Sequence, residues 1–166
     1  MKIKPIYIIA LFLLLLIIGF CRESKAEVSI EAGPTFLSDS RSHGGVLLLS
    51  ERFGKYDFGL GYVSEQNVNV PCGSPLARSV RCDYDIRENI FVSAQRIVTF
   101  NRCELGIGPA YFSNTNRALG KQFTIGLSAG CHISKKLSLV IRHYSNAGSG
   151  TPNLGQDALM IRYSFK

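Results

Sequence analysis

The sequence predicts a small, closed antiparallel β-barrel that crosses a membrane with eight strands. Three observations lead to this prediction. The chain begins with an apolar export signal, its remainder divides into eight segments that alternate between apolar and polar residues, and the connections between these segments alternate between short and long. A length of 166 residues is enough for one domain of this kind and little more.

The start of the chain has the pattern of a secretory signal peptide. Two lysines are followed by an uncharged apolar run over residues 6–20, and Ser24 and Ala26 place small residues at the −3 and −1 positions of a cleavage site. The alternative is an uncleaved membrane anchor, for which the apolar run is short. We therefore predict that residues 1–26 are removed and that residues 27–166 form the barrel domain.

The charge and cysteine content restrict the partners and the compartment. The formal net charge of +7 falls to +4 after removal of residues 1–26, which carry four basic residues and one acidic residue. No single stripe of lysine and arginine carries this excess, so we expect no nucleic-acid partner. Four cysteines remain in the mature chain, and an even number behind an export signal indicates an oxidising compartment.

The mature chain contains eight predicted strands, separated by clusters of glycine, asparagine and serine. Several of them have about the 9–11 residues that a tilted strand needs to cross a bilayer. The segments are 27–37, 45–53, 55–66, 88–99, 103–113, 121–133, 136–146 and 156–165.

The lengths of the connections support a membrane barrel. Short turns are predicted near Gly54 and at residues 100–102 and 134–136, and long loops lie between them. Bacterial outer-membrane barrels have short periplasmic turns on one rim and longer extracellular loops on the other. The long loops are expected at residues 38–44, 67–87, 114–120 and 147–155.

The two faces of each predicted strand differ in polarity. In the segment 136–146, for example, Leu137, Leu139 and Ile141 share one face. Such alternation also fits a soluble sandwich or a lipocalin-like barrel. One observation argues against this alternative. The polar faces of the strands would point inward and bury several charged side chains, and the core of a soluble protein rarely contains so many. These residues are Glu31, Asp57, Glu104 and Arg162.

The cysteines form two predicted pairs. Cys72 and Cys82 bracket a short stretch of the longest loop, and we expect a disulfide between them. Cys103 and Cys131 should lie opposite one another on the apolar face of neighbouring strands, where either a disulfide or two small apolar side chains would fit. We expect no zinc site, because the cysteines lack the paired close spacing of zinc ligands.

A histidine, a serine and a carboxylate converge at the predicted outer rim. His143 and Ser145 are two residues apart on one strand and therefore share its lipid-facing side, and Asp157 begins the next antiparallel strand on the same side. A serine becomes a nucleophile when a histidine takes its proton, and a carboxylate holds that histidine in the correct tautomer. The alternative is that these residues only end the apolar band at the membrane interface.

The segment from His143 to Asp157 resembles the signature of the PagL-type lipid A 3-O-deacylases. The family pattern runs His-x-Ser-Asn-x-Gly, then Pro-Asn-x-Gly, then an acidic residue twelve positions after the serine, and this chain has each element. The motif covers about the last thirty residues. The resemblance implies an outer-membrane barrel that removes an ester-linked acyl chain from lipid A.

The resemblance also implies roles for individual residues. Ser145 would be the nucleophile, His143 the general base, and Asp157 the residue that orients the histidine. Asn146 matches an asparagine associated with the oxyanion hole, while Asn153 and Gly148 would contribute to substrate binding. The usual acidic residue of the family is glutamate, so the aspartate of this chain departs from the pattern by one methylene group.

The sequence therefore predicts a serine esterase that acts on lipid A of lipopolysaccharide within the lipid of the bacterial outer membrane. We expect it to need no cofactor and no metal, and the sequence leaves a monomer and a homodimer open. The alternatives are a non-enzymatic outer-membrane barrel, such as an adhesin or a structural protein, and an esterase that acts on phospholipid.

Overall fold

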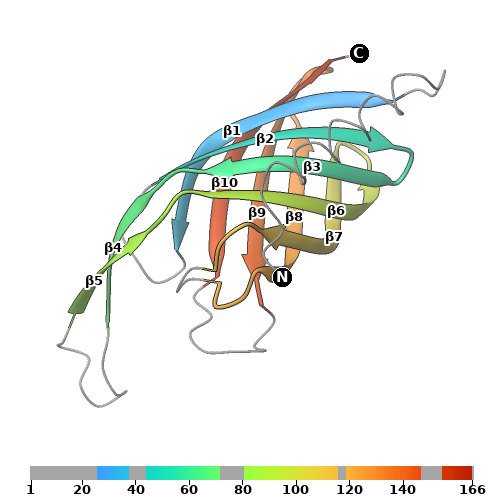
Figure 1. Ribbon diagram of the computed structural model, residues 1–166. Helices are drawn as coiled ribbons and strands as arrows, with labels where there is room; N and C mark the ends of the chain where they lie inside the picture. The colour runs from blue at the N-terminus through green and yellow to red at the C-terminus, as the bar shows by residue number, and fades with distance from the viewer. Residues whose placement is uncertain (1–25, 38–43, 72–80, 116–118, 147–154, 166) are drawn as a thin grey trace.

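Eight strands of the chain form a closed antiparallel barrel, which confirms the predicted fold class (Figure 1). In the computed structural model, hydrogen-bonded neighbours follow the order β1-β10-β9-β8-β7-β6-β3-β2, and β1 closes the barrel by pairing with both β2 and β10. The structure describes residues 26–37, 44–71, 81–115, 119–146 and 155–165. Apart from Ala26, the predicted signal peptide lies outside these residues and stays a prediction.

The eight barrel strands agree with the eight predicted segments to within three residues at either end. Closure leaves no strand edge unpaired, as a chain that crosses lipid requires. The strands are β1 (Glu27–Leu37), β2 (Gly44–Phe53), β3 (Tyr56–Val63), β6 (Asn89–Phe100), β7 (Cys103–Phe112), β8 (Phe123–His132), β9 (Leu137–Ser145) and β10 (Gln156–Phe165).

Two further strands, β4 (Gln66–Pro71) and β5 (Arg81–Ile86), occupy much of the segment that we expected to be a loop over residues 67–87, and only Gln66 precedes it. They form a two-stranded sheet that extends beyond the barrel (Figure 1). The pairing of Val63 with Asn89 and that of Gln66 with Ile86 follow one continuous register, so this hairpin prolongs the ladder of β3 and β6. The asparagines of β4 indicated a turn, but pairing along an existing ladder outweighs that local preference.

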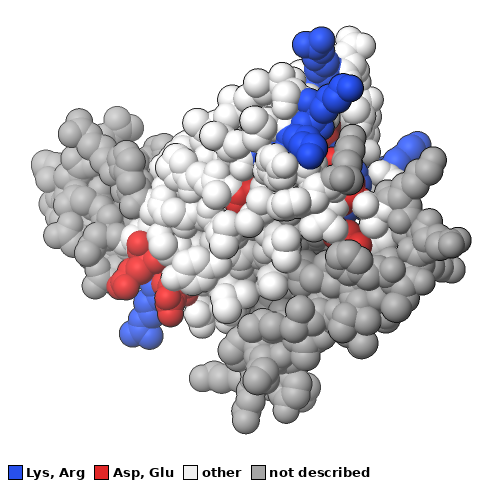
Figure 2. All heavy atoms as spheres, turned by 90° about the horizontal axis from the view of Figure 1, so that it is seen from above, with Lys and Arg blue, Asp and Glu red and all other residues white. Residues whose placement is uncertain are grey.

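The outer wall of the barrel is apolar. Residues alternate strictly along β10, where the side chain of Ile161 is 58% exposed and that of its neighbour Arg162 only 3%. Most of the wall in Figure 2 is white, while blue spheres project at one end and a group of red and blue spheres at the other. An apolar outer band around a polar interior is the surface of a membrane-spanning barrel. The exposed side chains include Leu47, Phe58, Leu105, Ile107, Leu127, Leu139 and Ile141.

No helix among the described residues is long and apolar enough to cross a membrane.

The barrel interior contains a network of buried ion pairs centred on Glu31. Arg142 donates to both carboxylate oxygens of Glu31 over 2.9 and 2.7 Å, and Arg162 donates to one of them over 2.8 Å. Arg162 also pairs with Glu104, which accepts two further hydrogen bonds from Arg52 over 2.8 and 3.0 Å. The interior charges that the sequence predicted are therefore present, and they are stable there because they are paired.

An apolar cluster fills the other part of the interior, beneath the outer rim. Phe91 and Phe112 stack with ring centroids 4.9 Å apart, and Tyr144 meets both rings edge-on. Leu119, which follows β7 in the chain, is completely buried in the same cluster. The aromatic rings give β9 a rigid support on its inner side, at the end where His143 and Ser145 lie.

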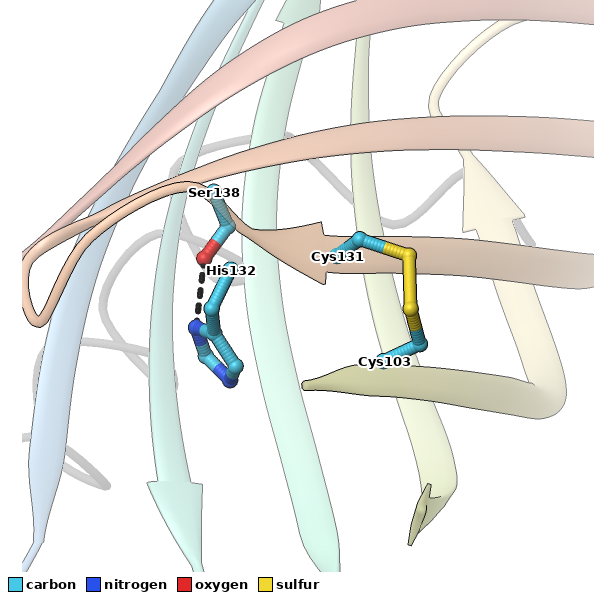
Figure 3. The surroundings of a disulfide bond; sticks show 4 residues. All are labelled: Cys103, Cys131, His132 and Ser138. Atoms are coloured by element: carbon cyan, nitrogen blue, oxygen red, sulfur yellow. Dashed lines mark hydrogen bonds between the residues drawn. A yellow bond between two sulfur atoms is a disulfide. The ribbon is translucent and has the colours of Figure 1, made fainter. Parts of the chain in front are cut away.

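A disulfide joins Cys103 of β7 to Cys131 of β8 near the short-turn rim (Figure 3). The two cysteines are directly opposite one another in the register, so the structure decides between the two arrangements that the sequence left open. Next to them, the imidazole of His132 hydrogen-bonds the hydroxyl of Ser138 over 2.8 Å. The expected bond between Cys72 and Cys82 stays a prediction, since Cys72 lies outside the described residues.

The ion-pair network makes a prediction about stability. We expect Glu31→Gln to lower the free energy of unfolding by about 3–5 kcal/mol, because it leaves two buried arginines facing a neutral amide. Guanidinium titration of the barrel in detergent micelles, followed by circular dichroism, measures this change.

The matched control is Glu65→Gln, since Glu65 is exposed. Its effect should stay within about 0.5 kcal/mol. Equal stability of both variants would contradict the central role of Glu31.

Candidate functional site

Three of the predicted site residues lie together at the outer end of β9 and β10. His143 and Ser145 are on β9, Asp157 is on β10, and all three are partly exposed on the outer wall of the barrel. The register pairs Asp157 directly with His143. Residues 143 and 145 share a face because side chains alternate along a strand.

His143 and Asp157 form a hydrogen-bonded pair. Nδ1 of the imidazole lies 2.7 Å from Oδ1 of Asp157, with the side chains 35% and 21% exposed. An ionised carboxylate only accepts, so the imidazole donates from Nδ1 and leaves Nε2 as the basic nitrogen. Aspartate is thus long enough to reach the histidine, because the register places the two residues directly opposite one another.

Ser145 shares the outward face of β9 with His143. It lies opposite Ile125 of β8, and none of the hydrogen bonds among the described residues joins the hydroxyl of Ser145 to the imidazole of His143. Hydrogen bonds between catalytic groups often tighten only when substrate binds. The arrangement therefore provides an oriented base and a nearby hydroxyl on one lipid-facing surface.

Two residues that the sequence analysis missed hold Asp157 in place. The hydroxyl of Thr35 on β1 donates to the main-chain oxygen of Asp157 over 2.8 Å, and Gln156 donates to that hydroxyl over 3.2 Å. Thr35 is 1% exposed. Since Thr35 and Asp157 are 122 positions apart, only closure of the barrel brings them together. Pairing of the first and last predicted strands was the one signal that could have indicated this contact.

The side chain of Asn146 lies on the other side of β9 from Ser145. It is 4% exposed, and its amide donates to the main-chain oxygen of Leu119 over 2.8 Å. Asn146 thus attaches the segment that follows β7 to the end of β9, directly below the candidate site. A role for Asn146 in an oxyanion hole stays a prediction. Gly148 and Asn153 lie outside the described residues.

Metal-ligating side chains do not gather at this site. Within the described ranges of the chain, no group of three or more His, Cys, Asp or Glu residues is arranged to hold a metal ion.

Comparison with known families identifies the segment that carries these residues. Residues 90–166 match the family model described as lipid A 3-O-deacylase (PagL). This confirms the resemblance to PagL-type deacylases. The matched segment covers somewhat less than half of the chain and includes His143, Ser145 and Asp157. No curated protein sequence shows significant similarity to the chain.

Solved structures of similar fold include three outer-membrane proteins. The crystal structure of the outer membrane enzyme PagL has 16% sequence identity and a TM-score of 0.45, with 84% of this chain and 99% of that chain covered. Ail of Yersinia pestis has 13% identity and a TM-score of 0.47, with 85% and 100% covered. The neisserial surface protein NspA has 15% identity and a TM-score of 0.42, with 86% and 97% covered.

The outer wall and the family match agree on the location of the protein. A closed barrel with a lipid-facing apolar surface is the form in which bacterial outer-membrane proteins cross their bilayer. The chain is therefore a β-barrel protein of the bacterial outer membrane.

The hydrogen bond between Asn146 and Leu119 leads to a prediction that separates a structural role of Asn146 from a catalytic one. Asn146→Ala removes the hydrogen bond to Leu119, so we expect a loss of about 1–2 kcal/mol in the free energy of unfolding. Asn114→Ala is the control, because Asn114 is exposed and contributes main-chain hydrogen bonds. An Asn146→Ala barrel of unchanged stability that hydrolyses esters poorly would instead favour the oxyanion role.

Proposed function

We propose that this protein is a lipid A 3-O-deacylase that uses Ser145, His143 and Asp157 as a catalytic triad. The observation that carries the proposal is the hydrogen-bonded pair of His143 and Asp157, which lies beside Ser145 within the segment that matches the PagL family model. An imidazole held by a carboxylate next to a serine hydroxyl is the constellation that activates serine in hydrolases of many folds.

The reaction proceeds in two acyl-transfer steps. Nε2 of His143 takes the proton of Ser145 as its oxygen attacks the ester carbonyl carbon, and the protonated histidine then donates to the departing sugar oxygen. The ester bond breaks and leaves an acyl group on Ser145. Water, deprotonated by His143, hydrolyses this intermediate and releases the fatty acid. Asp157 stabilises the charged imidazole in both steps, and neither step needs a metal or a cofactor.

The position of the site on the barrel supports a lipid substrate. Ser145 and His143 lie at the outer end of an apolar wall, next to Ile125 and Leu127 of β8. A lipid in the surrounding leaflet would place its acyl chain along this wall and its headgroup towards the outer rim. The ester bond lies between these two parts of the molecule and would thus come close to Ser145. The resemblance to the family adds Asn153 and Gly148 as substrate-binding residues, whereas Asn146 could serve the oxyanion only after its side chain leaves Leu119.

A non-enzymatic barrel is the main alternative. An adhesin or a structural barrel has no need of a carboxylate hydrogen-bonded to an imidazole on its lipid-facing wall, and this pair therefore favours the enzyme. A phospholipid esterase would use the same three residues. The chemical nature of the released product separates these functions.

The proposal is tested by mass spectrometry of lipid A from cells that produce the wild-type chain. We expect the loss of one ester-linked acyl chain with wild type and no loss with Ser145→Ala. Ser64→Ala, which changes the serine that follows β3, is the matched control and should retain activity. Unchanged lipid A with a folded wild-type barrel would contradict the proposal, and free fatty acid from phospholipid alone would identify the phospholipid esterase.

The short distance between His143 and Asp157 predicts the effect of restoring the glutamate that is usual in the family. Aspartate already reaches Nδ1 at 2.7 Å, so we expect the extra methylene of Asp157→Glu to displace the imidazole and lower kcat by about 100-fold. Asp157→Asn should lower kcat by up to about 10⁴-fold, because the amide favours the wrong tautomer. A gain of activity in Asp157→Glu would show that aspartate is the poorer partner in this barrel.

A further inference from the structure

Gly155 lies directly against the imidazole of His143. A Cβ atom at this position would be 2.6 Å from Cε1 of the ring, 3.4 Å from Nε2 and 3.5 Å from Nδ1. The first of these distances is shorter than a non-bonded contact between carbon atoms allows. The ring therefore occupies the space that any other amino acid at position 155 would need for its side chain.

Gly155 lies one residue before β10, at the end of the ladder with β9. The last pair of the two strands at this end is Gln156 with Tyr144, and Asp157 pairs with His143 one step further in. Gly155 is buried. The imidazole of His143 thus lies against the start of β10.

The segment from Gly155 to Asp157 holds the imidazole at two points. Gly155 contacts its edge and Asp157 hydrogen-bonds its Nδ1. Between them, the buried side chain of Gln156 points to the interior and donates to Thr35 of β1. The segment is thus anchored to the neighbouring strand. A side chain added at Gly155 would therefore displace the imidazole of His143 and not the segment.

We propose that Gly155 is a positioning residue for His143, which sets the plane of the imidazole and keeps the ring against Asp157. The catalytic part of this statement rests on the proposed function, whereas the contact itself does not. A side chain at position 155 would push the ring away from Asp157. A displacement of about one ångström at a catalytic group can cost about 100-fold in rate.

The backbone offers a second reason for glycine, which the test has to separate from the first. Gly155 has a φ of +68°, a conformation that residues with a side chain rarely adopt. Gly54, in the turn between β2 and β3, provides the matched control. Its φ is +58°, and a Cβ there would meet nothing within 4 Å. Gly54→Ala thus introduces the same backbone strain without the contact.

The first experiment is a double-mutant cycle on the midpoint of thermal unfolding, in detergent micelles. Gly155→Ala should lower the midpoint more than Gly54→Ala does. In a His143→Ala background, where the ring is absent, its effect should fall to that of Gly54→Ala. An effect of Gly155→Ala that persists without the imidazole would overturn the proposal, as would an effect equal to that of Gly54→Ala in the presence of the ring.

Whether the Gly155→Ala variants fold also tests the contact between Gly155 and His143. If Gly155→Ala fails to form a heat-modifiable barrel, then folding of the Gly155→Ala/His143→Ala barrel supports the contact. Failure of both variants would show that glycine serves the backbone alone, and would overturn the proposal.

The second experiment measures the reactivity of Ser145 towards a fluorophosphonate probe with a decyl chain. The probe reports on how well His143 activates the serine. We expect Gly155→Ala to react about 100-fold more slowly than wild type, Gly54→Ala to react within about twofold of wild type, and Ser145→Ala not to react. Equal labelling of Gly155→Ala and wild type would overturn this inference and leave the proposed function intact. An unlabelled wild-type barrel would contradict the proposed function, while the double-mutant cycle would still decide whether the contact exists.

Discussion

A chain that crosses a lipid bilayer has to satisfy all its main-chain polar groups within itself, and the pairing of β1 with β10 is the contact that meets this requirement here. It closes the sheet and separates an apolar outer wall from a polar interior. It also brings Thr35 next to Asp157, two residues that are 122 positions apart in the chain. The candidate site therefore depends on the same strand pair that closes the barrel.

The interior of the barrel makes the wall rigid below the site. The network around Glu31 ties arginines from β9 and β10 to a carboxylate of β1, so three neighbouring strands share buried charges. Closer to the outer rim, Tyr144 packs edge-on against two stacked phenylalanine rings. Because Tyr144 lies between His143 and Ser145 in the chain, this packing on the inner side supports the two residues that face outward.

The outer wall determines what kind of molecule can reach the candidate site. His143, Ser145 and Asp157 are only partly exposed, and the neighbouring outer side chains are large and apolar. A lipid that lies beside the wall can approach this surface without leaving the membrane. Under the proposed function, a serine, a histidine and an acid at the lipid boundary would combine hydrolytic chemistry with direct access to a membrane-bound ester.

The sequence by itself determined the strand pattern, the inward charges, and the His143-x-Ser145 and Asp157 motif, because alternation and short-range spacing are local properties of the chain. Only the tertiary structure showed that β4 and β5 extend the ladder of β3 and β6 and that Cys103 bonds Cys131. It also decided the inward direction of Asn146 and the contacts of Asp157 with Thr35 and of His143 with Gly155. These features depend on the register between strands and on the closure of the barrel, and no local pattern specifies either of them.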